Sequence, residues 1–268
     1  MTLQQDRSGW LTARGVGKRF AIAGREVRAL AGLDLDIASG EFIAILGASG
    51  CGKSTLLRLF AGLETPDEGE VRHAGARISG PSLARGIVFQ EHRLFPWLTV
   101  AQNVEAALLN APGSKPAKRQ TATELIALVG LSGFEGAYPH QLSGGMAQRA
   151  AIARGLVNRP DTLLLDEPFG ALDALTRAHL QRELRRIWQR QRTTTLLVTH
   201  DVDEALLLGE RVVVMTPRPG RIARIFALPP ELPRDHADPD FARLRGKILA
   251  TLDAGPAVPA AGLTEHAA

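Results

Sequence analysis

The sequence has a single cysteine, few aromatic residues and little net charge. Because Cys51 is alone, the chain cannot form an internal disulfide, which fits a reducing compartment. Aromatic residues make up 5% of the 268 residues, and 32 Lys and Arg against 28 Asp and Glu leave a net charge of +4. So small a basic excess gives weak support for an anionic ligand or surface, and it fits a solvated surface at least as well.

Long apolar runs are also absent. The first ten residues, MTLQQDRSGW, lack the apolar region of a secretory signal, and no run approaches the roughly 20 apolar residues that cross a bilayer. We therefore expect any role at a membrane to depend on a partner. Hydrophobic residues still make up 45% of the chain, which is enough for a sizeable core.

Short apolar strands alternate with helical segments along most of the chain. Strands are predicted at EFIAILG, DTLLLDEP and TTTLLVTHD, and helical spacing follows in KSTLLRLFAGL and DALTRAHLQRELRRIWQRQ. Hairpins are predicted in the first forty residues and around Arg218-Pro219-Gly220. This alternation predicts an α/β fold with a largely parallel sheet. The chain is Pro-rich from Pro229, and we expect a short helix and then a disordered tail.

The segment GASGCGKS matches the phosphate-binding pattern G-x-x-x-x-G-K-[ST] between a predicted strand and helix. Its glycines let backbone N–H groups face phosphate oxygens, Lys53 adds a positive charge, and Ser54 offers a hydroxyl to Mg²⁺. Cys51 fills a variable position, where a helix N-terminus lowers a thiol pKa but a tolerated small residue fits better. The predicted nucleotide-binding residues here are Gly47, Ala48, Ser49, Gly50, Cys51, Gly52, Lys53, Ser54 and Thr55.

Acidic and polar residues follow the other predicted strands. Asp166 ends LLLD, where a P-loop enzyme needs a carboxylate for Mg²⁺, and Glu167 is placed to activate a water as a general base. His200 ends LLVTH and Gln90 ends GIVFQ, so both are expected near the ligand crevice, with Gln90 also a candidate for Mg²⁺. A single His or Gln is more often structural, and these two predictions depend on their neighbours.

A second candidate anion site lies in LSGGMAQR. Ser143 is a good helix N-cap, and Gly144 and Gly145 leave backbone N–H groups open to an anion. Taken alone, this string is more typical of a flexible helix start.

Six motifs in order resemble the ATP-binding subunits of ABC transporters: GASGCGKST, FQ at Gln90, LSGGMAQR, LLLDEP, ALDAL and VTHD. The likeness runs from about residue 11 to residue 226. It implies that Phe20 stacks on adenine, although spacing alone places Phe20 in the core. It further implies that Gln90 is the Q-loop glutamine and that the signature is Ser143 to Gly145. Asp173 resembles the D-loop aspartate, and His200 resembles the switch histidine.

The resemblance implies a P-loop NTPase with a RecA-like mixed sheet core, an N-terminal antiparallel β subdomain and a helical subdomain at about 100–157. The ATP-binding domain would span residues 11–230 and a C-terminal tail 231–268. In this family two subunits pack head to tail with ATP and Mg²⁺ between them, so the signature of one copy faces the nucleotide of the other. Met146 departs from the usual Gln, a variation common in importers.

A narrower likeness involves VFQEHRLFPWLTVAQNV and VVVMTPRPGRI, which resemble importer ATPases for nitrate, taurine and aliphatic sulfonates. The sulfonate group is most similar around Phe95-Pro96-Trp97, and thiamine-precursor importers remain an alternative. This implies a permease dimer, a periplasmic solute-binding protein and a peripheral position on the cytoplasmic face of the inner membrane. The apolar run Leu94, Phe95, Trp97 and Leu98 would contact the permease, or would simply pack within the helical subdomain.

Two rival functions are weaker. Soluble ABC ATPases that act on DNA carry long coiled coils, and those that act on ribosomes carry two cassettes, whereas this chain has neither feature. A P-loop kinase would leave LSGGMAQR unexplained. The basic run RELRRIWQRQR reads as the solvated face of a helix, so we expect no nucleic-acid partner.

Overall fold

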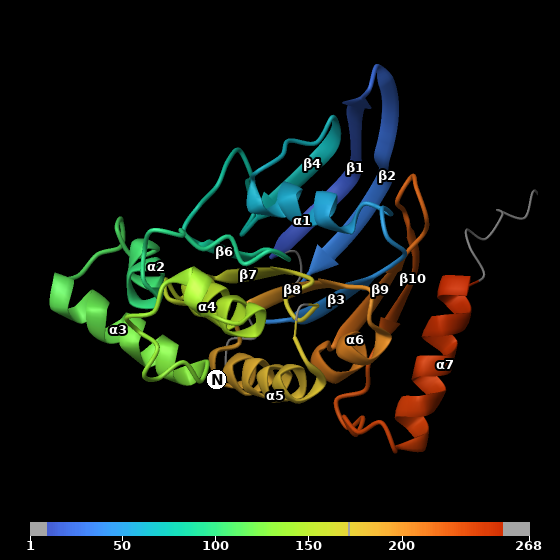
Figure 1. Cartoon of the computed structure of the whole chain (residues 1–268). Helices are drawn as coiled ribbons and strands as arrows, with labels where there is room; N and C mark the ends of the chain where they lie inside the picture. The colour runs from blue at the N-terminus through green and yellow to red at the C-terminus, as the bar shows by residue number, and fades with distance from the viewer. Residues whose placement is uncertain (1–9, 171, 254–268) are drawn as a thin grey trace, which may run out of the picture.

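The computed structural model describes residues 10–170 and 172–253, which form two sheets with helices between and around them (Figure 1). The first sheet is antiparallel, in the order β2-β1-β4-β5. Its strands are β1 (Leu11–Ile22), β2 (Arg25–Ile37), β4 (Glu68–His73) and β5 (Ala76–Arg77). The predicted early hairpin is therefore present, with β1 paired to both β2 and β4.

The second sheet has six strands in the order β10-β9-β3-β8-β7-β6. Neighbours from β9 to β6 run parallel, and only β10 is antiparallel, as the hairpin partner of β9. The strands are β3 (Phe42–Leu46), β6 (Arg85–Val88), β7 (Thr162–Asp166), β8 (Thr194–Thr199), β9 (Arg211–Met215) and β10 (Ile222–Ala227). Strands β3, β7 and β8 are buried throughout, as expected when helices or a second sheet cover both faces.

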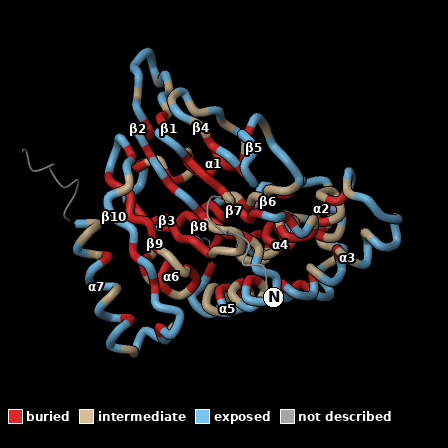
Figure 2. Tube along the Cα trace, turned by 180° about the vertical axis from the view of Figure 1, so that it is seen from behind, coloured by how far each residue is buried: buried red, intermediate tan, exposed pale blue. Residues whose placement is uncertain are grey.

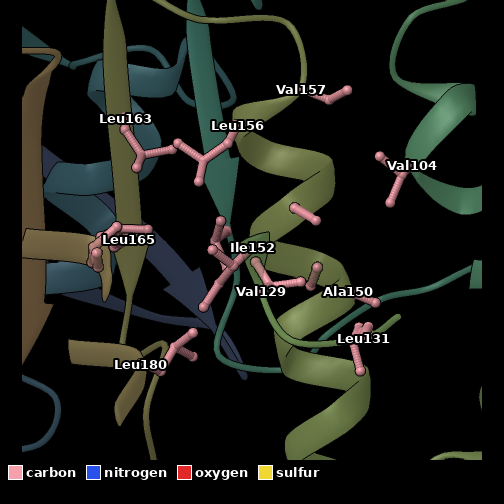
Figure 3. Packing of buried hydrophobic residues seen from close by; sticks show 14 of the residues in the cluster. Val104, Val129, Leu131, Ala150, Ile152, Leu156, Val157, Leu163, Leu165 and Leu180 are labelled. Carbon is pink, nitrogen blue, oxygen red and sulfur yellow. The ribbon is translucent and has the colours of Figure 1, made fainter. Parts of the chain in front are cut away.

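The core consists of three clusters of buried apolar residues, which together cover both faces of the central sheet. Helix α1 (Lys53–Ala61) packs with residues of both sheets, including Ile43, Ile45 and Leu164. The opposite face packs against α4 (Gly144–Leu156) and α5 (Ala174–Gln191). Figure 3 shows Ile152 and Leu156 of α4 beside Leu163 and Leu165 of β7.

A group of helices, α2 (Val100–Ala106), α3 (Lys115–Leu128) and α4, forms one end of the molecule, shown in green in Figure 1. At the other end α6 (Val202–Leu208) and α7 (Pro239–Asp253) pack on β3 and β9 through a third cluster that includes Phe241 and Ile248. A short 3-10 helix, η1 (Pro139–Gln141), precedes α4. The predicted helix after Pro229 corresponds to α7, and residues 254–268 of the expected tail lie outside the described residues.

The burial map in Figure 2 places the buried chain along the central sheet and exposed chain on the β1–β2 hairpin and the outer helices. None of the helices within the described residues combines the length and hydropathy needed to cross a bilayer.

Candidate functional site

Four parallel strands bring polar residues to one edge of the central sheet. The loop after β3 carries the glycines of the P-loop, β7 ends at Asp166, β8 is followed by His200, and β6 ends two residues before Gln90. Because the carboxyl ends of parallel strands form the ligand crevice of such sheets, a cavity is expected there. One of about 510 Å³ is present. Its lining includes ten predicted residues: Phe20, Ser49, Gly50, Gly52, Lys53, Ser54, Thr55, Gln90, Glu167 and His200.

Lys53 lies at the start of α1, at the base of the P-loop. It is buried, and its Nζ donates to the carbonyl oxygens of Gly47 (2.8 Å) and Ala48 (3.1 Å). The N-cap, Gly52, makes no side-chain capping bond, so the first N–H groups of α1 remain available to an anion. Gly52 has φ 99°, and a Cβ there would lie 2.8 Å from the carbonyl oxygen of Ala29. Only glycine fits this position.

Asp166 and Ser54 form an oxygen pair beside the P-loop. The Ser54 hydroxyl donates to Asp166 at 2.9 Å, and burial raises the pKa of Asp166. No group of three or more His, Cys, Asp or Glu residues that could hold a metal occurs in the described part of the chain. That is compatible with Mg²⁺, which usually takes one or two protein oxygens and completes its shell with water and substrate phosphates. The donor set present therefore fits Mg²⁺.

Glu167 has the geometry of a constrained functional residue. Its φ is 45°, a left-handed value rare for a residue with a side chain, and its N–H donates to the Val198 carbonyl at 2.9 Å. Its carboxylate lies 3.0 Å from Nδ1 of His200 and accepts from the Gln90 amide at 3.4 Å. Three polar groups from three strand ends thus converge on one point in the cavity, where a water molecule could be oriented and deprotonated.

Phe20 is only half-buried and lies at the edge of this cavity, in the lining with Val27 and Ala29. The interpretation of Phe20 as a core residue, based on spacing alone, is wrong. An aromatic ring in the cavity lining can stack on a planar base.

The signature segment lies elsewhere. Ser143 caps α4 by accepting from the Met146 N–H at 3.3 Å, and Asp173 caps α5 by accepting from the Thr176 N–H at 3.0 Å. Ser143, Gly144 and Asp173 are exposed. Within the described residues, the cavity lining includes neither Asp173 nor any part of the segment from Ser143 to Gly145. The two candidate anion sites of one chain therefore do not meet.

Cys51 is not the activated thiol that its place before α1 suggests. It is buried, and this burial raises its pKa. Its side chain packs in the cluster between the two sheets, so it behaves as a small apolar residue.

Arg218 is the main residue of this cavity that the sequence did not indicate. It lies in the β9–β10 turn, lines the cavity, and donates from Nε to the Gly50 carbonyl at 3.3 Å. The turn is fixed against β2, because Gly220 donates to the Ala29 carbonyl (2.8 Å) and accepts from Ala31 (3.1 Å). These contacts join segments nearly two hundred residues apart, and no local pattern signals them.

Comparison with known proteins is consistent with this geometry. The family model described as "ABC transporter" matches residues 30–170. The chain is 48% identical to a Bacillus subtilis protein named aliphatic sulfonates import ATP-binding protein SsuB, over 88% of this chain and 91% of that protein. The chain belongs to the ABC transporter family.

Other members of the family extend the comparison. An uncharacterized ABC transporter ATP-binding protein of Methanocaldococcus jannaschii is 49% identical, over 89% of this chain and 90% of that protein. A dimeric structure of the bacterial ABC transporter cassette MJ0796 superposes with a TM-score of 0.76, at 34% identity, over 82% of this chain and 99% of that chain. A dimeric post-hydrolysis state of MJ0796, bound to ADP and Pi, gives a TM-score of 0.75 at 33% identity, with the same coverage. The predicted fold class, that of an ABC ATPase, is confirmed.

Proposed function

We propose that this chain is the ATP-hydrolysing subunit of an ABC importer that takes up aliphatic sulfonates through a partner permease. The observation that carries the proposal is the convergence of the P-loop, Glu167, His200 and Gln90 on one cavity, beside which Asp166 is bonded to Ser54 of the lining. Support for the solute comes from the 48% identity to the sulfonate import protein of Bacillus subtilis over most of both chains.

In this proposal the cavity binds ATP with Mg²⁺. Phe20 stacks on the adenine, the open N–H groups before α1 bind the phosphates, and Lys53 neutralises part of their charge. Ser54 and Asp166 would hold Mg²⁺, with Gln90 as a third candidate oxygen, and the ion would neutralise phosphate charge. Glu167 accepts a proton from the attacking water, and His200 fixes the Glu167 carboxylate and faces the γ-phosphate.

We propose that two copies complete the site. The exposed Ser143, Gly144 and Asp173, with the half-buried Gly145, are available to a second chain, and both solved MJ0796 cassettes described above are dimers. A head-to-tail pair would place the N-terminus of α4 from one copy on the γ-phosphate bound by the other, which neutralises the phosphates from both sides. The functional unit is then the domain 11–230, with the helical subdomain at about 100–157 and an appended segment 231–268.

The permease would dock beside Gln90. Phe95 and Trp97 are 42% and 70% exposed, and buried Asn103 holds their loop by accepting from the Phe95 N–H at 2.8 Å. The expectation that Leu94 shares this surface is wrong: Leu94 is buried in the core, because its loop turns back onto α4. Arg154 of α4 donates to the carbonyl oxygens of His92 (2.8 Å) and Arg93 (2.7 Å), which makes this loop a rigid link between permease and nucleotide.

As an importer subunit the chain would lie on the cytoplasmic face of the inner membrane, and a periplasmic solute-binding protein would deliver the solute. Deletion of the gene tests the solute. We expect uptake of a labelled alkanesulfonate to be lost and to return with the wild-type gene, but not with a Glu167→Gln copy. Retained alkanesulfonate uptake with loss of nitrate, taurine or thiamine-precursor uptake would overturn the sulfonate assignment.

The docking surface is tested separately with purified protein and the importer complex in vesicles. Trp97→Ala should leave the ATPase rate of the isolated chain unchanged, because Trp97 is exposed and does not line the nucleotide cavity, and should abolish stimulation by the permease. Leu83→Ala is a matched control, since Leu83 is 52% exposed but lies between β5 and β6, outside both this loop and the nucleotide cavity lining. Normal stimulation of Trp97→Ala would refute this docking surface.

A further inference from the structure

A second cavity, of about 260 Å³, lies between α5, α6 and the segment that leads to α7. Four cationic or titratable side chains contribute to its lining: Arg182 and Arg185 from α5, and Arg234 and His236 from the connecting segment. Ala178, Leu207 and Leu208 supply apolar surface, and no lining residue is shared with the nucleotide cavity. The space suits a small oxyanion with some water, since one water molecule takes about 30 Å³ in the liquid.

The arginines of this cavity lack an acidic partner. Its lining contains no Asp or Glu, and across residues 10–170 and 172–253 none of the three arginines forms an ion pair within 4.0 Å. The charge of Glu210 acts on both Arg185 and Arg234, but Glu210 forms its own ion pair with Arg192 at 3.0 Å. Three like charges therefore gather around one partly buried space.

Hydrogen bonds to the C-terminal end of α6 use only some of the N–H donors of Arg185 and Arg234. Arg185 donates to the Leu207 carbonyl and Arg234 donates to the Leu206 carbonyl, at the C-terminal end of α6 where carbonyl groups are otherwise unpaired. A guanidinium has five N–H donors, however, and Nε of Arg234 is buried without a hydrogen-bond partner among the described residues. Burial and the charge of Arg185 lower the pKa of Arg234 to about 10. An anion in the cavity would offset both the burial of the Arg234 charge and its repulsion by Arg185.

We propose that this cavity binds a small, doubly charged oxyanion of the sulfate or phosphate type from solution. Two partly buried guanidinium groups and the exposed Arg182 and His236 present several donors to one point, and planar guanidinium groups suit the geometry of such anions. The proposal does not depend on which solute the importer carries.

An anion bound in this cavity should affect ATP turnover, because hydrogen bonds connect the cavity lining to the end of β8. Gln181, which lines the cavity, donates to Glu204 at 3.2 Å, and Glu204 accepts from the Thr199 hydroxyl at 2.7 Å. Thr199 precedes His200, and α5 begins directly after Asp173. An anion that holds α5, α6 and the connecting segment together therefore acts on the elements that carry the switch histidine and the D-loop aspartate.

Titration calorimetry with sodium sulfate at constant ionic strength tests the site. ADP and Mg²⁺ are kept saturating throughout, because sulfate would also bind an empty P-loop. Arg182→Glu should weaken sulfate binding by at least about tenfold, the loss of one charge-assisted hydrogen bond. Arg190→Glu makes the same charge change on exposed α5 surface outside the cavity, and it should bind sulfate like the wild type. Equal affinities in the two variants, or no saturable binding by the wild type, would overturn the proposal.

Turnover is then measured at saturating ATP over the same sulfate range. The rates of wild type and Arg190→Glu should change with a midpoint at the calorimetric Kd, whereas the rate of Arg182→Glu should not change in that range. Circular dichroism establishes that both variants are folded. If sulfate binds but leaves all three rates equally unchanged, the link to turnover is refuted while the site itself stands.

Discussion

The P-loop cavity and the segment around Ser143 differ in how far one chain completes them. In the cavity, Lys53 has two carbonyl partners, Asp166 has Ser54, and Glu167 has His200 and Gln90. At Gly144, by contrast, an added Cβ would meet nothing within 4 Å. Leu175, close to Asp173, is 85% exposed. The first region is prepared for a ligand by its own chain, and the second is an exposed surface that we propose a second copy covers.

The largest expected effect comes from Glu167→Gln, which tests the P-loop cavity. Loss of the general base should lower the turnover rate by about 10³-fold, while ATP binding is retained because the P-loop is untouched. Steady-state ATPase assays together with equilibrium binding of ATP give both numbers. A variant with near-normal turnover would show that another group activates the water.

Gly144→Glu tests the exposed segment around Ser143. A carboxylate placed against the partner's triphosphate should weaken ATP-dependent dimerisation by at least about 100-fold, as expected for an uncompensated buried charge. The fold should be unaffected, since Gly144 borders open space. Sedimentation with ATP measures the dimer, and Gly136→Glu, also at an exposed glycine with open space, is the matched control. Equal dimerisation of both variants would contradict the role of the signature.

Lys53→Ala should weaken ATP binding by about 10- to 100-fold, because a charge-assisted contact to phosphate is lost. Lys115→Ala, at an exposed residue of α3, controls for the loss of one positive charge. Fluorescent nucleotide binding measures both affinities. Together with Gly144→Glu, this variant sharpens the comparison: Lys53→Ala should impair binding to the single chain, and Gly144→Glu only the assembly of two.

The smallest effect concerns stability. Burial raises the pKa of Asp166, so the ionised form is disfavoured in the fold. For a carboxyl group this means that stability is lost as pH rises through the folded pKa. Asp166→Asn removes the charge and should raise the Tm of the nucleotide-free protein near pH 7 by about 2–4 °C, with a flatter pH dependence, while abolishing Mg²⁺-dependent hydrolysis. Calorimetry at several pH values measures this, and a lowered Tm would contradict the account.

Much of the fold could be predicted because its signals are local. A fully apolar strand, a glycine-rich loop and a helix follow one another around Lys53, and the β9–β10 hairpin contains a Pro-Gly turn. The strand ends could likewise be assigned, since Asp166 is the last residue of a buried strand and His200 directly follows another. Residues on consecutive parallel strands converge at one edge whatever the intervening loops do.

The remaining features depend on contacts between distant segments. Gly220 packs against the P-loop so closely that a Cβ would lie 2.0 Å from the Cys51 carbonyl oxygen, and this contact brings Arg218 to the cavity. The burial of Leu94 and the half-exposure of Phe20 likewise follow from packing that periodicity does not record. Arg234 reaches α6 from the segment after β10, where the sequence indicates only a Pro-rich connection.

Native mass spectrometry of Glu167→Gln with ATP and Mg²⁺ tests most directly whether two chains share the nucleotides. The account predicts a dimer that contains two ATP molecules, which disappears when Gly144→Glu is added and persists with Gly136→Glu. A single chain that carries ATP at every protein concentration, or a dimer that forms equally well with Gly144→Glu, would contradict it.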